Sequence, residues 1–141
     1  MFRHFMREHL AIFGCLLPLM GCSSEPVKIE GANLVCAFVE GYVETKVLIM
    51  SSPPSEAVSY AETLVPTPES LSSVSPFTVE AKNILLDYRE AIIRWSSELS
   101  AYTQDENKAR FAEASKALES SIDNLAEKCE KLGWEFKDDW R

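Results

Sequence analysis

The fold is decided by residues 81–102, which read AKNILLDYREAIIRWSSELSAY. Apolar side chains recur there at alternating intervals of four and three residues, at Ala81, Leu85, Tyr88, Ile92, Trp95, Leu99 and Tyr102. This spacing places them on one face of a helix, and a face kept for about three heptads is typical of a helical bundle. The pattern therefore predicts a long helix that packs against other helices.

A second stripe with the same spacing follows, at Phe111, Ser115, Leu118, Ile122, Leu125, Cys129 and Leu132. Between the stripes, residues 103–106 have the Thr-x-x-Glu form of a capping box, which predicts that the last helix begins there. Gly133 follows the stripe at the place of a left-handed C-cap. Because the connection near Thr103 is very short, these two helices are expected to form an antiparallel hairpin.

A third long helix is expected over residues 31–50, where two adjacent apolar stripes make a wide buried face. The stripes consist of Val35, Phe38, Tyr42 and Ile49, and of Cys36, Val39, Val43, Val47 and Met50. Prolines at 53 and 54 end this helix. A short helix over residues 54–64 and a proline-rich loop over residues 65–76, with one turn after Pro68, complete the chain.

No strand pattern of comparable quality occurs, so the predicted fold is all-α. We expect a small antiparallel bundle of three long helices plus one short helix, linked by one disulfide.

The amino-terminal segment has the features of a secretory signal peptide. Arg3 and Arg7 outweigh Glu8, and residues 10–20 form an uncharged apolar run, LAIFGCLLPLM. The run is shorter than the roughly 20 residues needed to span a bilayer. A positive start, a short apolar run and small residues after it predict cleavage and export.

The end of that run, Leu19-Met20-Gly21-Cys22, resembles the lipobox of bacterial lipoproteins. The resemblance implies that residues 1–21 are a lipoprotein signal peptide and that cleavage leaves Cys22 as the first residue. It implies a covalent diacylglyceryl group and an acyl group such as palmitate on Cys22, with no other cofactor. Two or three acyl chains give stable membrane anchoring. The implied location is the exported side of a bacterial envelope membrane, and the outer membrane if the host has two, because Ser23 is not aspartate.

The mature chain is expected to consist of a lipidated tether over residues 22–28 and one helical-bundle domain over residues 29–141. Besides Cys22 it keeps Cys36 and Cys129, each on a predicted buried stripe. Export permits disulfides, so this pair predicts a bridge between the first and last helices. For so long a loop the chain-entropy model gives about 4.5 kcal/mol. The alternative is two separately buried thiols.

The composition argues against a catalytic role and against nucleic-acid binding. Both histidines, His4 and His9, lie in the leader, so the mature chain has none for a triad, a general base or a metal site. The full chain carries a net charge of −8, and losing the leader makes it more negative, which does not suit phosphate binding. Acidic residues of the first stripe's helix are expected on its solvated face; they are Glu80, Asp87, Glu90 and Glu98.

The unusual surface candidate is the carboxy-terminal tail, with Trp134, Phe136 and Trp140 in a short polar stretch. These rings would contact a partner or the membrane interface, or would fold back to close the end of the bundle. The function that fits best is a lipid-anchored, non-enzymatic envelope module that binds another envelope protein. The alternative is a binder of a small apolar ligand between helices near Trp95 and Tyr102.

Overall fold

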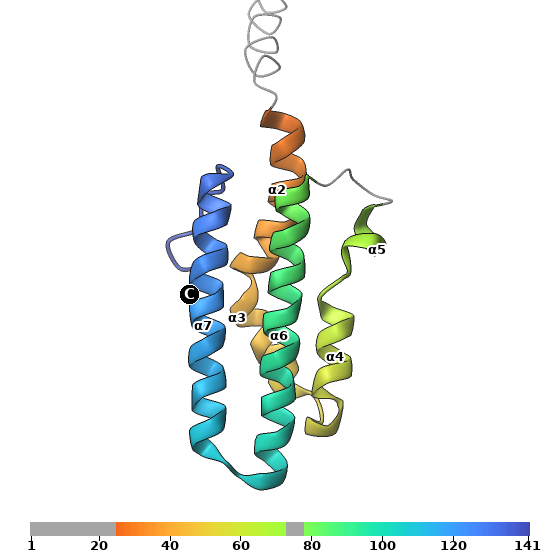
Figure 1. Cartoon of the computed structure of the whole chain (residues 1–141), viewed down its shortest axis with the longest axis vertical. Coiled ribbons are helices and arrows are strands. Elements are labelled where there is room, and N and C mark those ends of the chain that lie inside the picture. Colours follow the sequence, from red (N-terminus) through yellow and green to blue (C-terminus); the bar gives the residue numbers. More distant parts are fainter. Residues whose placement is uncertain (1–24, 73–77) are drawn as a thin grey trace, which may run out of the picture.

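The computed structural model describes residues 25–72 and 78–141, and these ranges contain helices and no strand (Figure 1). The elements are α2 (Glu25–Glu40), α3 (Tyr42–Ser51), η1 (Pro54–Glu56), α4 (Ala57–Leu64), α5 (Pro68–Ser72), α6 (Val79–Asp105) and α7 (Lys108–Lys131). The signal peptide, the lipobox and Cys22 lie outside the described residues. The all-α prediction is confirmed for the described part of the chain.

The two long helices, α6 with 27 residues and α7 with 24, lie side by side as an antiparallel hairpin (Figure 1). The predicted stripes form their contact: Leu85, Tyr88, Ile92, Leu118 and Ile122 are buried. The stripes become half-buried toward the hairpin turn, at Leu99, Tyr102 and Phe111. Trp95 bridges the pair, because its indole Nε1 donates to Ser115 Oγ at 3.2 Å. Heptad spacing thus identified both helices and their facing sides.

The predicted start of the last helix is wrong. Thr103 stays inside α6, where its hydroxyl donates to the Ser100 carbonyl at 2.7 Å. The chain turns instead at Glu106, which has a left-handed φ of 53°. Asn107 then caps α7, its side-chain oxygen accepting from the Arg110 amide at 3.1 Å. Asparagine is among the strongest N-cap residues, so it outcompetes the threonine nearby.

The predicted stop at Gly133 is confirmed. Its φ is 91°, and its amide donates to the Glu130 carbonyl at 2.9 Å. The Trp134 amide donates to the Cys129 carbonyl at 3.0 Å, which completes a Schellman motif. Glycine adopts this backbone conformation without a steric penalty. The motif reverses the chain and directs the tail back toward the bundle.

The predicted third long helix is divided at Gly41, so the bundle has two long helices rather than three. Helix α2 begins at Glu25, earlier than expected, and ends at Glu40, while α3 follows from Tyr42. Gly41 has a ψ of 17°, outside the helical range. Glycine weakens a helix interior by about 1 kcal/mol relative to alanine, and a kink at glycine is common.

The predicted burial of Val47 and Met50 is also wrong, because their exposed fractions are 55% and 52%. Helix α7 packs on α2, whereas α3 packs on α4. The outer side of α3 therefore has no helix over it within the described ranges. Only Tyr42 and Ile49 of α3 are buried.

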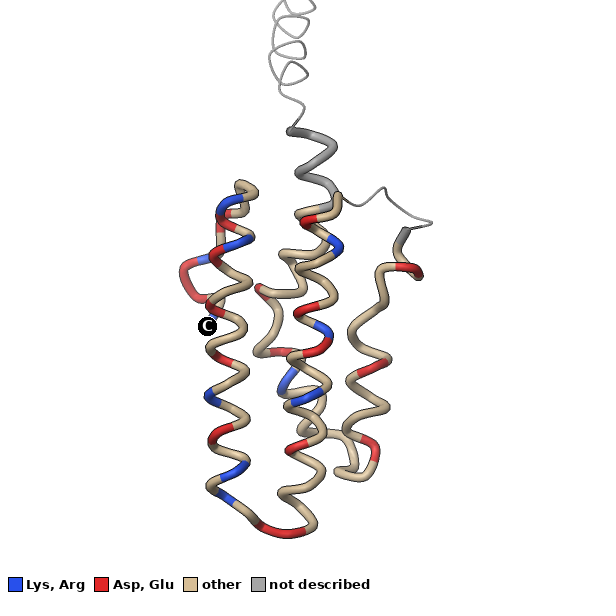
Figure 2. Tube along the Cα trace, in the orientation of Figure 1, with Lys and Arg blue, Asp and Glu red and all other residues tan. Residues whose placement is uncertain are grey.

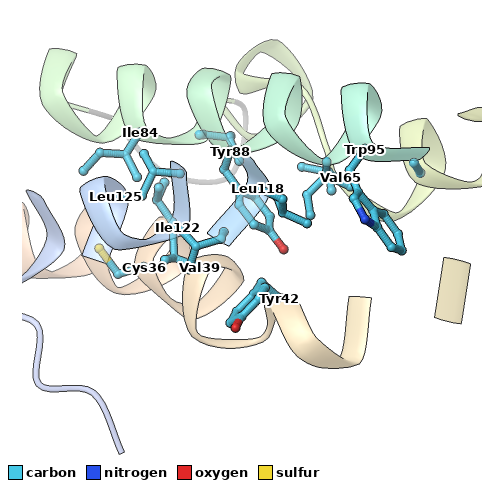
Figure 3. Close-up of a cluster of buried hydrophobic side chains, with 14 of the residues drawn as sticks. Cys36, Val39, Tyr42, Val65, Ile84, Tyr88, Trp95, Leu118, Ile122 and Leu125 are labelled. Atoms are coloured by element: carbon cyan, nitrogen blue, oxygen red, sulfur yellow. The ribbon is translucent and has the colours of Figure 1, made fainter. Parts of the chain in front are cut away.

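The short helix expected over residues 54–64 is present as η1 followed by α4. Helix α4 packs on α6, and Ala57, Ala61 and the adjacent Val65 are buried in the common core. Figure 3 shows Val65 there, beside Trp95. The turn expected after Pro68 is helix α5. The described part of the predicted loop thus follows the expectation.

The predicted disulfide is confirmed. Cys36 of α2 and Cys129 of α7 are bonded, with Cα atoms 5.8 Å apart and a sequence separation of 93 residues. Both side chains are fully buried in the core. The bridge joins the amino-terminal helix to the carboxy-terminal one, and the alternative of two separate thiols is excluded.

Candidate functional site

The carboxy-terminal tail returns along the side of the bundle, beside α7 (Figure 1). Trp134 donates from Nε1 to Glu40 Oε2 of α2 at 3.0 Å. Phe136 stacks on Trp140 at 4.3 Å between centroids, and Trp140 meets the Tyr42 ring edge-on at 5.9 Å. All three tail rings are half-buried against the core cluster. The rings fold back as the second interpretation expected, although along the side of the bundle rather than over its end.

Charged side chains hold the end of the tail in place. The Arg141 guanidinium lies over the Trp140 ring, 4.4 Å from its centroid, and also pairs with Asp123 of α7. Lys137 Nζ lies 3.7 Å from Glu40 Oε1. Glu40 therefore anchors the tail twice, once through an indole and once through an ammonium group.

An open groove of about 600 Å³ lies between the tail and the α2–α3 junction; we call it the tail groove. Its lining contains Ala37, Gly41, Trp134 and Trp140, together with Glu40, Glu44, Glu135, Lys137 and Asp139. Four carboxylates thus face one ammonium group, and Figure 2 shows acidic positions in the tail loop beside α7. The groove combines aromatic walls with an excess of negative charge.

A polar cluster joins α3 to α7. The Tyr42 hydroxyl donates to Glu119 Oε2 at 2.9 Å, and Lys46 Nζ lies 3.3 Å from Glu119 Oε1. The same ammonium lies 5.5 Å from the Trp95 ring centroid, within cation–π range. Burial, the hydrogen bond to Glu119 and its charge raise the pKa of Tyr42 to about 12. Tyr42 is therefore a neutral hydrogen-bond donor at physiological pH.

Tyr88 is the second tyrosine with a strongly shifted pKa. It is fully buried in α6, and burial raises its pKa to about 12 although the hydrogen bond to Thr45 acts in the opposite direction. Its hydroxyl donates to Thr45 Oγ1 at 3.3 Å, and its ring packs in the core (Figure 3). Sequence periodicity predicted the burial of Tyr88, but not this polar contact.

These shifts predict that the domain loses stability in alkali. The unfolded tyrosine ionises near pH 10, whereas folded Tyr88 ionises at about 12. The stabilisation is complete below pH 10 and is lost as pH rises toward 12, amounting to about 2–3 kcal/mol for Tyr88. Melting curves between pH 8 and about pH 12 should therefore be less pH-dependent for Tyr88→Phe than for the wild type. Tyr60→Phe, on α4, is the control; equal slopes in all three proteins would contradict the prediction.

Aromatic side chains contact one another in the region where a small apolar ligand was expected. Phe111 stacks on Tyr102 at 5.1 Å and contacts Trp95 at 6.0 Å between ring centroids. The adjacent surface groove of about 260 Å³ contains the charged residues Arg94, Glu98, Arg110 and Glu113 in its lining. The aromatic side chains thus pack on one another, and the lining of the nearby groove combines these charged groups with apolar side chains, among them Trp95 and Leu118.

Three of the α6 carboxylates are paired with cations. Glu90 bonds Arg94 at 2.9 Å, Asp87 approaches Lys128 at 3.3 Å, and Glu98 bonds Arg110 at 2.5 Å.

Within residues 25–72 and 78–141 no group of three or more potential ligands is placed to hold a metal ion. Across the same ranges, none of the helices combines the length and apolarity needed to cross a membrane.

Comparisons of the chain with protein-family models, with curated proteins and with solved structures gave no match.

Proposed function

We propose that the chain is an exported bacterial lipoprotein, anchored to an envelope membrane through lipid on Cys22. Its helical domain serves as a non-enzymatic module that binds another envelope protein.

The observation that carries the proposal is the fate of the cysteines. Cys36 and Cys129 form a buried bridge, which is typical of proteins in an oxidising compartment and so supports export. Cys15 lies in the predicted leader, and Cys22 is then the single cysteine left for another use. It stands at the end of the Leu19-Met20-Gly21-Cys22 motif, where lipoproteins carry their lipid.

The arrangement of the helices fits such an anchor. Helix α2 begins at Glu25, close in sequence to Cys22, so the fold starts almost at the attachment point. The starts of α2 and α6 and the end of α7 lie toward the same end of the bundle (Figure 1). The hairpin turn at Glu106 and Asn107 lies at the other end, and α6 spans about 40 Å. The anchored domain would therefore present its long sides, together with the turn, to partners above the bilayer.

A binding role fits the side chains better than catalysis. The expected mature chain has no histidine, three of its α6 carboxylates are paired, and both shifted tyrosines are neutral at physiological pH. The alternative, binding of a small apolar ligand near Trp95, has less support because Phe111 occupies that position.

Replacement of Cys22 tests the anchor. Cells fed an alkyne fatty acid should label the wild type and the Cys15→Ser control equally, whereas Cys22→Ser should carry no label. Cys22→Ser should also be released from the membrane fraction or remain unprocessed. Equal labelling of wild type and Cys22→Ser would refute the proposal.

A further inference from the structure

The solvent-facing half of α3 carries three exposed apolar side chains, with Val47 near its middle and Leu48 and Met50 on either side of it. Their exposed fractions are 55%, 45% and 52%, and they are three of the five large apolar side chains exposed in the described part of the chain. The other two, Val79 and Leu86, lie on α6. Clustered apolar side chains on a surface mark interaction sites, whereas scattered ones need no explanation. We call these three residues the α3 patch.

The α3 patch continues into the tail groove. Glu44 lies one helical turn before Leu48 on α3 and also lines the groove. Residues three and four positions apart on a helix are neighbours, so Glu44 adjoins both Val47 and Leu48. Beyond Glu44 the groove adds Trp134, Glu135 and Asp139. Val47 and Leu48 thus lie next to a negatively charged, aromatic-walled groove.

We propose that the α3 patch and the tail groove together bind a basic, amphipathic segment of a partner protein. Apolar side chains of that segment would cover the α3 patch, and its lysine or arginine side chains would enter the tail groove. The inference rests on the proposed function, because it assumes that a protein partner exists. It adds the chemistry of that partner and the surface that binds it.

Charge selects this occupant over the others. A second copy of the chain would bring the same carboxylates against one another, and anionic lipid headgroups would be repelled by them. A segment bearing lysine or arginine meets the carboxylates with opposite charge. The groove's own cation, Lys137, is already paired with Glu40 at 3.7 Å.

The chain contains its own example of the proposed recognition. The Arg141 guanidinium lies 4.4 Å from the Trp140 ring centroid and pairs at the same time with the Asp123 carboxylate. Arginine suits this combination, since a planar guanidinium stacks on an aromatic face and bonds a carboxylate. In the tail groove, Trp134 with Glu44 and Glu135 offers the same two groups to a partner.

Binding of a designed peptide tests the surface. The protein is the mature chain as isolated from cells, held in phosphatidylcholine nanodiscs, or in buffer if it carries no lipid. The probe is a fluorescent peptide of about 14 residues with leucines on one helical face and lysines and arginines on the other. Empty nanodiscs give the background.

Two pairs of substitutions at the surface are compared with two matched pairs elsewhere. Val47→Ser with Leu48→Ser should weaken peptide binding about tenfold, because two apolar contacts are lost. Glu44→Gln with Glu135→Gln should weaken it about fivefold at low salt and less at high salt. The controls, Val79→Ser with Leu86→Ser and Glu62→Gln with Glu130→Gln, should bind within about twofold of wild type. All substituted residues are exposed, so melting curves should stay close to wild type.

The outcomes separate this inference from the anchor. Equal affinity of the surface variants and their controls would overturn it, whatever the result with Cys22→Ser. A dimer that Val47→Ser with Leu48→Ser dissolves would also overturn it, because the occupant would then be a second copy. If peptide binding follows the substitutions while Cys22→Ser still labels with lipid, the docking surface stands and the anchor falls.

Discussion

Replacing Cys36 and Cys129 together by alanine should lower the free energy of unfolding by about 4.5 kcal/mol. The bridge closes a loop of 93 residues, so its loss frees most of the unfolded chain and makes unfolding more favourable. For a domain of this size the melting temperature should fall by about 15 °C. Thermal unfolding followed by circular dichroism measures the change.

Position makes this loss larger than that of a surface bridge. Both cysteine side chains are fully buried, and their bond links α2 to α7, two helices that are far apart in the sequence. Alanine leaves a small cavity at each site, which adds to the entropic loss. Alkylation of the wild-type protein without reductant should modify neither cysteine, even after denaturation. Recovery of two free thiols, or a double variant that melts within a few degrees of wild type, would contradict the prediction.

The α6–α7 hairpin could be predicted because the same apolar spacing is repeated many times in both helices. Seven positions in each stripe share one spacing, all apolar except Ser115, and a chance pattern rarely persists so long. Cys129 belongs to one of these stripes, so the same periodicity placed a cysteine in the core and made its pairing with Cys36 a sound inference.

The first predicted helix failed for a physical reason. Residues 42–51 are apolar on several sides, so their pattern does not say which side the protein covers. That choice depends on where α4 and α7 pack, which is tertiary information. Gly41 was the sequence signal for a break in this helix. At the start of the last helix, Asn107 was a stronger N-cap residue than Thr103, although the Thr103 motif was the one chosen.

The tail groove could be foreseen only in part. The sequence showed three aromatic residues after Gly133, but the direction of the tail depends on hydrogen bonds made by that glycine and Trp134. Its contacts with Glu40 and Tyr42 join segments distant in the sequence. No local pattern encodes such a return, and partner contact by these rings stays a prediction.

Deleting residues 136–141 should destabilise the domain by several kcal/mol and lower its melting temperature by about ten degrees. The deletion removes the stacked Phe136 and Trp140 rings and exposes the Tyr42 ring that Trp140 covers. At about 25 cal/mol per Å², and about 150 Å² per ring, the lost burial outweighs the entropy that the freed chain gains. Asp138→Asn, an exposed change within the same tail, is the control and should melt as wild type does.

The size of that fall decides what the tail rings do. A loss of ten degrees or more makes Phe136 and Trp140 part of the fold, and a binding defect in the deleted protein would then report unfolding rather than a lost contact. A melting temperature within a few degrees of wild type would contradict the prediction and leave the rings free for a partner or the membrane interface. If the melting temperature falls by ten degrees or more, partner binding has to be tested by substituting residues that contribute little to stability. Glu44 and Glu135 are such residues, because they are exposed. Comparing the truncated protein with Asp138→Asn therefore shows whether the tail rings stabilise the fold. If they do, partner contact is tested at the exposed carboxylates that line the groove.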